Sequence, residues 1–238
     1  MQRLRGMIKR EQLRPGERLG SERGLCAALG VDRSPLRAAL EVLERCGEIR
    51  RTMGRLGGVF VSDGKVTRHL NTIQGVPDML RQQGLRHDTS LLRAEVGTPD
   101  RLECRQLRLA ERDPVIRLTR RRDAAGVPLS LDSMAIPARL LPGWTRLDFS
   151  VSVYEILRRE YGIEPARAAE TIELGAATDA QARILQVPAG APLFDIRRLT
   201  VDTADRPIEL SRDLFRADRT RISLERLGTN WKRAARPR

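Results

Sequence analysis

The stretch GVDRSPLRAALEVLERCG, residues 30–47, places basic and hydroxyl side chains at the start of a predicted helix. Its apolar positions follow helical spacing and consist of Leu36, Leu40 and Leu43. Arg33 and Arg37 are four residues apart and share the opposite face, with Ser34 beside them. Guanidinium groups can contact guanine O6 and N7, and a helix N-terminus can bind phosphate. The pattern therefore predicts a helix that contacts nucleic acid; an amphipathic surface helix with solvated arginines is the alternative.

The residues before this helix predict a partner helix that packs against it. Residues 3–12 predict a short helix, and LRPGERL at residues 13–19 predicts a Pro-Gly turn. Ser21 is a candidate N-cap for a helix over residues 22–29 that ends at Gly30. Two helices joined by a tight turn form a helix-turn-helix.

The start of the basic helix and the segment after it complete the predicted domain. Pro35 lies in the first turn, where its missing N–H costs little. The N-cap is either Asp32 or Ser34. A hairpin follows, with strands at residues 49–52 and 59–62 and a glycine-rich turn at residues 54–58. This order of elements predicts a winged helix-turn-helix.

Two arginines in the second part of the chain continue the apolar face of a predicted strand. In the strand over residues 115–122, alternation places Arg120 and Arg122 on the same side as Ile116 and Leu118. A buried charge needs an anionic partner. The arginines therefore predict an anion site, unless the strand frays into solvent or the two pair with acidic residues of the chain. The acidic candidates are Asp132 and Glu209.

A serine further along the chain opens a predicted helix. SVYEILRREYG contains Ser152 and Glu155 in S-x-x-E spacing, which predicts a capping box. The helix start is also a candidate anion site. In the last predicted hairpin, one face carries Glu209, Ser211, Asp213 and Phe215.

A weak internal repeat predicts the architecture of this second part. Residues 113–137 and 191–215 share a turn, a strand, a polar turn with a proline, and a second strand. Each copy follows a helical segment. Two copies of a helix and a hairpin predict an α+β domain, an antiparallel sheet covered by helices.

The overall charge favours an acidic partner. The 238 residues carry a net charge of +13, with a pI of about 11.1. Because a GC-rich genome also favours arginine codons, the distribution is more informative than the total. Residues 1–68 hold 15 basic and 8 acidic residues, so over half of the net charge lies in this quarter of the chain.

Cysteine and histidine content argues against several classes of protein. Cys26, Cys46 and Cys104 form no C-x-x-C pair, which predicts free thiols in a reducing cytoplasm. With only His69 and His87, the chain offers no multi-histidine metal site and little for a Ser-His-Asp mechanism. No signal peptide or apolar run of about 20 residues is present. We expect no cofactor, no metal, no membrane association and no catalytic residues.

The N-terminal 50 residues or so resemble the winged helix of GntR-family bacterial transcription regulators. The family pattern runs PG..LPSER.LA..LGVSR.TVR.AL..L...G, then a glycine-tipped wing ending in FV. The resemblance places DNA contacts on Arg23, Arg33, Ser34, Arg37, Gly54 and Arg55. The chain departs from the pattern at Gly20, Gly24, Asp32 and Pro35. Because the last two remove hydroxyl groups, Ser34 becomes the main hydroxyl contact and the operator sequence cannot be copied from relatives.

The remainder resembles the UTRA effector domain of the HutC subfamily, through RRRDAAGVPLSLD, SVYEILRREYG and DRPIELSRDLFRADR. This implies a chorismate-lyase-like antiparallel sheet with helices. The effector site implied by position consists of Val76, Arg120, Arg122, Asp132, Ser152, Tyr154, Glu209 and Phe215. The expected domains are residues 1–65, a linker at 66–74, an effector domain at 75–225 and a basic tail at 226–238.

The combined hypothesis is a transcription regulator, a repressor that binds double-stranded DNA. It would bind an inverted-repeat operator as a homodimer formed through the C-terminal domain. A small anionic metabolite, bearing phosphate, sulfate or carboxylate, would modulate its affinity. The alternatives are an enzyme acting on an anionic small molecule, or a DNA-binding protein without an effector. The sequence does not reveal the effector, the operator, the regulated genes or the direction of the response.

Overall fold

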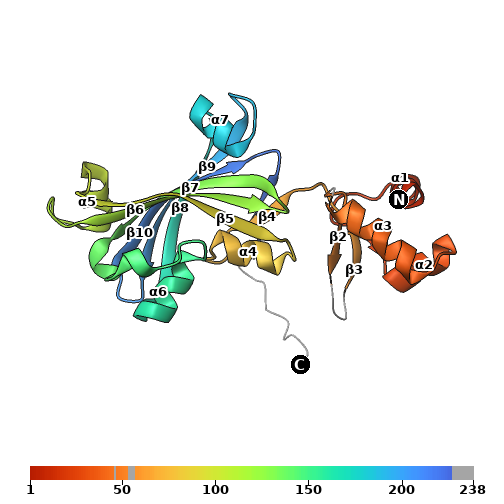
Figure 1. Cartoon of the computed structure of the whole chain (residues 1–238), viewed down its shortest axis with the longest axis horizontal. Helices are drawn as coiled ribbons and strands as arrows, with labels where there is room; N and C mark the ends of the chain where they lie inside the picture. Colours follow the sequence, from red (N-terminus) through yellow and green to blue (C-terminus); the bar gives the residue numbers. More distant parts are fainter. Residues whose placement is uncertain (46, 53–56, 227–238) are drawn as a thin grey trace.

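The computed structural model describes residues 1–45, 47–52 and 57–226. In the N-terminal part, the head, three helices lie beside a small sheet (Figure 1). The helices are α1 (Gln2–Arg10), α2 (Glu22–Leu29) and α3 (Arg33–Arg45). The strands are β1 (Arg18–Gly20), β2 (Ile49–Thr52) and β3 (Gly58–Val61), in the order β1-β3-β2. Strand β1 was not expected, because its first two residues were assigned to the turn predicted at residues 13–19.

Local chemistry sets the boundaries of the helix pair. The Ser21 hydroxyl accepts a hydrogen bond of 3.0 Å from the backbone N–H of Gly24, as an N-cap does. Gly30 ends α2 in the left-handed region at φ 59°. Helix α3 begins directly after Asp32, which leaves Pro35 in the first turn. The structure thereby confirms both predicted helices.

The apolar stripe of α3 forms the centre of the head core. Leu36, Leu40 and Leu43 are all buried, and they pack with Leu4 of α1 and Leu25 of α2. Burying side chains of this size stabilises a fold by about 1.5–3 kcal/mol each. The opposite face of α3 is left to the solvent.

The segment expected to be a linker, residues 66–74, begins with regular structure. Residues Val66–His69 form strand β4, which pairs in parallel with β11 (Thr220–Ser223) near the other end of the chain. Val66 and Arg68 point inward and are buried. This segment is therefore packed onto the C-terminal domain. The domain limits at residues 65 and 75 remain predictions.

The C-terminal domain is built on a six-stranded antiparallel sheet in the order β5-β6-β7-β10-β9-β8. The strands are β5 (His87–Gly97), β6 (Val115–Ala124), β7 (Val127–Pro137), β8 (Pro165–Ala176), β9 (Pro192–Asp202) and β10 (Pro207–Arg216). The helices are α4 (Val76–Gln82), α5 (Arg101–Leu107), α6 (Val153–Tyr161) and α7 (Asp179–Leu185), with short 3-10 turns at Ala138–Leu140 and Trp144–Arg146.

The internal repeat corresponds to the two halves of this sheet. Each half contains a helix, an edge strand, a second helix and a hairpin, and the two hairpins meet where β7 pairs with β10. The second helices even share a cap. Asp100 with Glu103 and Thr178 with Gln181 form capping boxes at corresponding positions. The structure is thus the α+β arrangement expected from the sequence.

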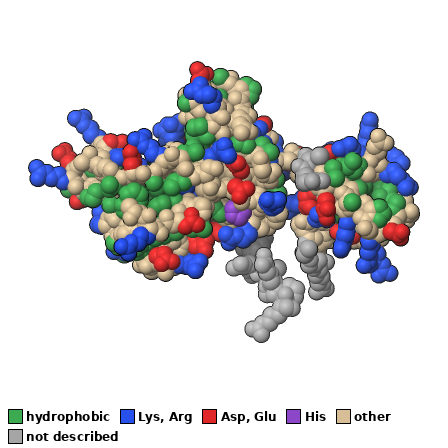
Figure 2. Space-filling model, in the orientation of Figure 1, with side chains coloured by type: hydrophobic (Ala, Val, Ile, Leu, Met, Phe, Trp, Pro, Cys, Tyr) green, Lys and Arg blue, Asp and Glu red, His purple; other side chains and the backbone are tan. Residues whose placement is uncertain are grey.

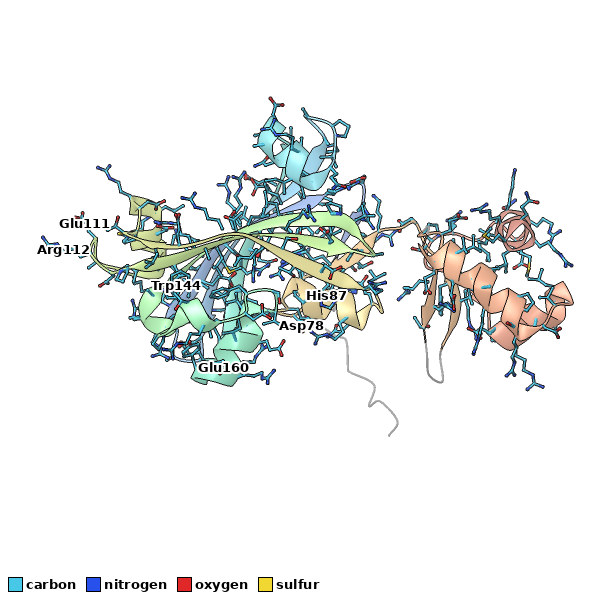
Figure 3. The ribbon with its side chains drawn as sticks, in the orientation of Figure 1. Asp78, His87, Glu111, Arg112, Trp144 and Glu160 are labelled. Atoms are coloured by element: carbon cyan, nitrogen blue, oxygen red, sulfur yellow. The ribbon has the colours of Figure 1, made fainter. Side chains whose placement is uncertain are left out.

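The helices cover both faces of the sheet. Helix α6 packs on Ile116, Leu118 and Met134, and α5 packs on the opposite face with Val115 and Ala135. Helix α4 shares the face of α6, and α7 shares the face of α5 (Figure 1). The labelled side chains of Asp78 in α4 and Glu160 in α6 lie on one side of the sheet in Figure 3. Within residues 1–45, 47–52 and 57–226, no helix has the length and apolarity to cross a bilayer.

Candidate DNA-binding surface and effector pocket

The basic face of α3 is open to solvent. Arg33, Ser34 and Arg37 are exposed, and so is Arg23 on the adjoining helix α2. Lys and Arg side chains project from the head at the right of Figure 2. Because the leucines of α3 are buried, the helix can offer these side chains to DNA without losing its own packing. Their role as DNA contacts remains a prediction.

An acidic residue that the sequence reasoning did not single out engages one of these arginines. The Nε atom of Arg37 donates to Glu22 of α2 across 2.9 Å. This hydrogen bond, followed by the Coulombic attraction of Glu22, raises the pKa of Arg37 above its ordinary value. Arg51 approaches the same carboxylate at 3.9 Å. Glu22 therefore holds Arg37 against α2, and a DNA base would have to compete with it.

Part of the predicted wing contact lies outside the described residues, namely Gly54 and Arg55. The two described wing arginines have partners in the head. The Arg51 Nε donates to Glu44 of α3 at 2.8 Å, and the Arg50 guanidinium lies 5.6 Å from the centre of the Phe60 ring. Arg51 thus joins the wing to α3.

The predicted effector residues converge on one small cavity of about 30 Å³. It lies between the starts of α4 and α6 and the face of the sheet beneath them. Its lining consists of Gly75, Val76, Arg120, Arg122, Asp132, Met134, Ser152, Val153, Tyr154, Arg198, Glu209 and Asp213. All predicted effector residues except Phe215 are among them. Their part in effector binding is not tested by this placement.

Arg120 is fully engaged by its own chain. Its Nε and a terminal nitrogen donate to one oxygen of Asp132, at 3.1 and 2.6 Å. Another terminal nitrogen donates to the Phe149 carbonyl at 3.2 Å. The side chain is only 2% exposed. The sequence left open whether this arginine pairs with Asp132 or Glu209. It pairs with Asp132 and not with Glu209.

Arg122 is held much more loosely. One terminal nitrogen donates to the Thr89 hydroxyl at 2.5 Å and to the Ser150 carbonyl at 3.2 Å. Within the described part of the chain its Nε has no hydrogen-bond partner, and it lies 3.6 Å from the second oxygen of Asp132. Burial, and then the charge of Arg120, lowers the pKa of Arg122 to about 10. Two guanidinium groups thus share one carboxylate, which leaves this end of the cavity with excess positive charge.

Ser152 corrects a prediction. It is the N-cap residue of α6, but its side chain makes no capping hydrogen bond and the predicted box with Glu155 does not form. The hydroxyl is buried without a partner and lies in the cavity wall. A methyl group on Gly75 would lie 3.0 Å from the Ser152 Cβ and closer still to its hydroxyl. The two helix starts therefore meet at this point.

The other end of the cavity is acidic and tightly bonded. The Tyr154 hydroxyl donates to Glu209 and lies 3.0 Å from the Thr200 hydroxyl. Burial and the neighbouring Glu209 raise the pKa of Tyr154 well above its usual range. Arg198 donates to the Tyr154 oxygen at 3.1 Å and to Asp213 at 2.9 Å.

Two charged residues of the cavity wall, Arg198 and Asp213, were not predicted as effector contacts, and one expected residue lies outside the wall. Arg198 occupies in β9 the place that Arg120 occupies in β6, so the internal repeat could have indicated it. Asp213 had been placed on the correct strand face. Phe215 does not line the cavity: it is fully buried in the apolar cluster below α4, where the Arg68 guanidinium lies 5.5 Å from its ring centre.

Comparison with known proteins gives two family matches. The profile described as "Bacterial regulatory proteins, gntR family" matches residues 1–61, and that described as "UTRA domain" matches residues 82–221. The HTH-type transcriptional repressor NagR of Bacillus subtilis is 28% identical over 219 residues, which cover 92% of this chain and 89% of NagR. The HTH-type transcriptional repressor PhnF of Mycolicibacterium smegmatis is 28% identical over 87% of this chain and 83% of its own length.

A solved structure shares the whole architecture. The crystal structure of PhnF from Mycobacterium smegmatis superposes with a TM-score of 0.68 at 27% identity, covering 95% of this chain and all of that one. The homologues are transcriptional repressors of a DNA-binding family, and not enzymes. Because the UTRA match spans more than half of the residues and follows a gntR match, the chain belongs to the HutC-type GntR family of bacterial transcription regulators.

Proposed function

We propose that this chain is a homodimeric repressor whose affinity for an inverted-repeat operator changes when a small anionic metabolite occupies the cavity at Arg122 and Ser152. The family membership supports repression and DNA binding. The exposed basic face of α3 supports recognition through Arg33 and Arg37, with Arg23 and Ser34 contacting phosphates.

One observation carries the effector site. Among the described residues, Arg122 Nε, the second oxygen of Asp132 and the Ser152 hydroxyl are buried side-chain atoms without a hydrogen-bond partner, and all three residues line one cavity. The first two face each other as an ion pair at 3.6 Å. Leaving such a group unsatisfied costs about 1–3 kcal/mol. A ligand that offers acceptors to Arg122 and Ser152 removes this cost for these two groups, whereas the Asp132 oxygen needs a donor. A cavity of about 30 Å³ is small for a metabolite, so a larger effector requires the lining to move.

The unpartnered donors of the cavity support an anionic small molecule as the effector. Arg122 is a donor with an under-compensated positive charge, and Ser152 lies at the start of a nine-residue helix. A phosphate, sulfate or carboxylate group matches both. At the acidic end, Glu209 and Asp213 favour hydroxyl or amine groups as the remainder of the molecule.

Calorimetric titration of the full chain with inorganic phosphate, against chloride at equal ionic strength, tests the site. We expect binding by the wild type, and at least tenfold weaker binding by Arg122→Gln, since a hydrogen bond to a charged group contributes about 1.5–3 kcal/mol. Arg212→Gln is the matched control, because Arg212 pairs with Asp195 outside the cavity. Equal phosphate affinity in all three proteins would show that phosphate does not bind there.

Titration with DNA tests the recognition surface. Arg37→Ala should relax base preference at one half-site position, at a cost of about 1–3 kcal/mol. Arg23→Ala should weaken binding to all sequences alike and reduce the slope of log affinity against log salt by about one. A loss of equal size on selected and scrambled duplexes for Arg37→Ala would refute its role in base reading. Sedimentation of the complex gives the number of chains per duplex.

A further inference from the structure

The strand that leaves the head carries a buried arginine, Arg68 of β4. Only 5% of its surface is exposed. One terminal nitrogen donates to Glu170 of β8 at 2.5 Å, and the guanidinium lies over Phe215 of β10. No described residue accepts a hydrogen bond from its Nε. Since Arg68 follows the head by only a few residues, its position is tied to the path of the chain between the two domains.

The carboxylate that Arg68 uses is shared with the effector pocket. The same Oε1 atom of Glu170 accepts a hydrogen bond of 2.5 Å from the Nε of Arg198. Arg198 also binds Asp213 and the hydroxyl of Tyr154, and all three residues line the cavity. An unbroken series of ionic and hydrogen-bonded contacts therefore runs from the pocket wall to β4.

This shared oxygen makes the surroundings of Arg68 depend on Arg198. Burial, and then the nearby charge of Arg198, lowers the pKa of Arg68, while Asp213 and Glu170 oppose that shift. Electrostatic interactions are stronger in a buried site than in water. An anion in the pocket attracts Arg198 and alters its hold on Glu170. Because Arg68 is buried, it cannot replace its contact with Glu170 by contacts with water. A shift of Glu170 should therefore move Arg68, and β4 with it.

The segment before β4 is fixed to the C-terminal domain as well. Asp63 pairs with Arg221 of β11, and the Lys65 ammonium donates to the Ala217 carbonyl at 3.1 Å. Strand β4 itself is only four residues long and pairs with β11. The end of the head is therefore connected to β4 and β11 through a short, anchored segment.

We propose that Arg68 couples occupancy of the effector pocket to the placement of the DNA-binding head, through the oxygen of Glu170 that it shares with Arg198. The inference rests on the proposed function, because it requires an anion to bind in that pocket. Arg68 is a positioning residue: it does not line the cavity and acts through Glu170 and Arg198.

The test measures how inorganic phosphate changes the affinity of the full chain for a duplex selected from a random pool by the wild type. Calorimetry of phosphate binding is run in parallel, with chloride at equal ionic strength. We expect phosphate to change wild-type DNA affinity about fivefold or more. In Arg68→Gln, phosphate should leave DNA affinity almost unchanged, while the affinity for phosphate itself stays within about threefold of the wild type. A purely structural role of Arg68 would not separate these two quantities. Arg68→Lys should restore part of the effect of phosphate on DNA affinity, and Arg212→Gln, the control, should leave it unchanged.

Each other outcome has a defined meaning. The coupling proposal is wrong if phosphate changes the DNA affinity of Arg68→Gln as much as that of the wild type. It is also wrong if phosphate binds the wild type without changing its DNA affinity. In both cases the proposed effector site is unaffected. If Arg68→Gln loses phosphate binding altogether, Arg68 belongs to the pocket and the coupling role is likewise wrong. If phosphate does not bind the wild type, both proposals fall. Should Arg68→Gln not fold, Glu170→Gln removes the shared oxygen's charge and carries the same expectations.

Discussion

Replacing Gly75 by alanine should damage the effector pocket through a single contact. The added methyl carbon would lie 3.0 Å from the Cβ of Ser152, whereas carbon atoms in contact stay about 3.5–4.0 Å apart. The Ser152 hydroxyl is nearer still, but it has no hydrogen bond and can rotate away. Rotation does not move the Cβ, so the starts of α4 and α6 must separate by about half an ångström or more. Gly75 has φ −71°, which alanine adopts without strain.

The magnitude follows from overpacking and from the lost hydroxyl. Forcing extra carbon into a packed site costs about 1–3 kcal/mol of the free energy of unfolding. Moving the Ser152 hydroxyl out of the cavity should weaken phosphate binding by at least tenfold, as the loss of one charged hydrogen bond does.

A double-mutant cycle isolates this contact. Ser152→Gly removes both atoms that clash, and glycine is tolerated at an N-cap at a cost of a few tenths of a kcal/mol. In that background, Gly75→Ala should cost less than about 0.5 kcal/mol in urea unfolding and should not weaken phosphate binding further. Gly6→Ala is the control, because a methyl group there meets nothing within 4 Å. It should stabilise α1 by about 0.5–1 kcal/mol.

One result would refute the reasoning. If Gly75→Ala costs the same in the wild type and in the Ser152→Gly background, the clash with Ser152 is not the cause. The convergence of the two helix starts would then not be what shapes the cavity.

Three further predictions concern the head and the back of the sheet. Leu40→Ala, at a fully buried position of α3, should lower the stability of the head by about 2–5 kcal/mol in urea unfolding followed by circular dichroism. Glu22→Gln should release Arg37 and strengthen DNA binding by up to about fivefold in an anisotropy titration, since an exposed ion pair is weak; weaker binding would mean that Glu22 orients Arg37 productively. Hydrogen bonding from Arg212 is the main cause of the lowered pKa of Asp195. The pair should therefore contribute its full stabilisation above the ordinary aspartate pKa, and this stabilisation should be lost as the pH falls through the lower pKa of the folded state. Arg212→Gln should therefore flatten the acid side of the profile of Tm against pH, and an unchanged profile would contradict the assignment.

Local signals in the sequence were sufficient for the head and for the sheet faces. A helix with Leu36, Leu40 and Leu43 on one side can bury only that side, so Arg33 and Arg37 had to be exposed. In the same way, strand alternation put Arg120 and Arg122 on the covered face of the sheet, where both are buried. Periodicity and turn chemistry act over a few residues, and a sequence displays them directly.

Contacts between residues that lie far apart in the chain could not be predicted from these local signals. The capping box at Ser152 has the correct residue types, yet its hydroxyl lies in the pocket wall beside Gly75, 77 residues earlier in the chain. Strand β4 carries a weak pattern and exists because β11, more than 150 residues later, pairs with it. Glu22 holds Arg37 because α2 and α3 pack together, which neither helix encodes alone.

The sequence by itself determined the helix pair and hairpin of the head, the α+β architecture, the family and the faces on which the arginines lie, because these depend on local spacing and on side-chain type. Only the tertiary structure decided which arginine is satisfied. Arg120 is held by Asp132 while Arg122 keeps an unpartnered nitrogen, and Glu170 is shared by Arg68 and Arg198. The reason is physical: a buried charge is compensated by whichever group the sheet register and the helices bring within hydrogen-bond distance, and that geometry belongs to the whole fold.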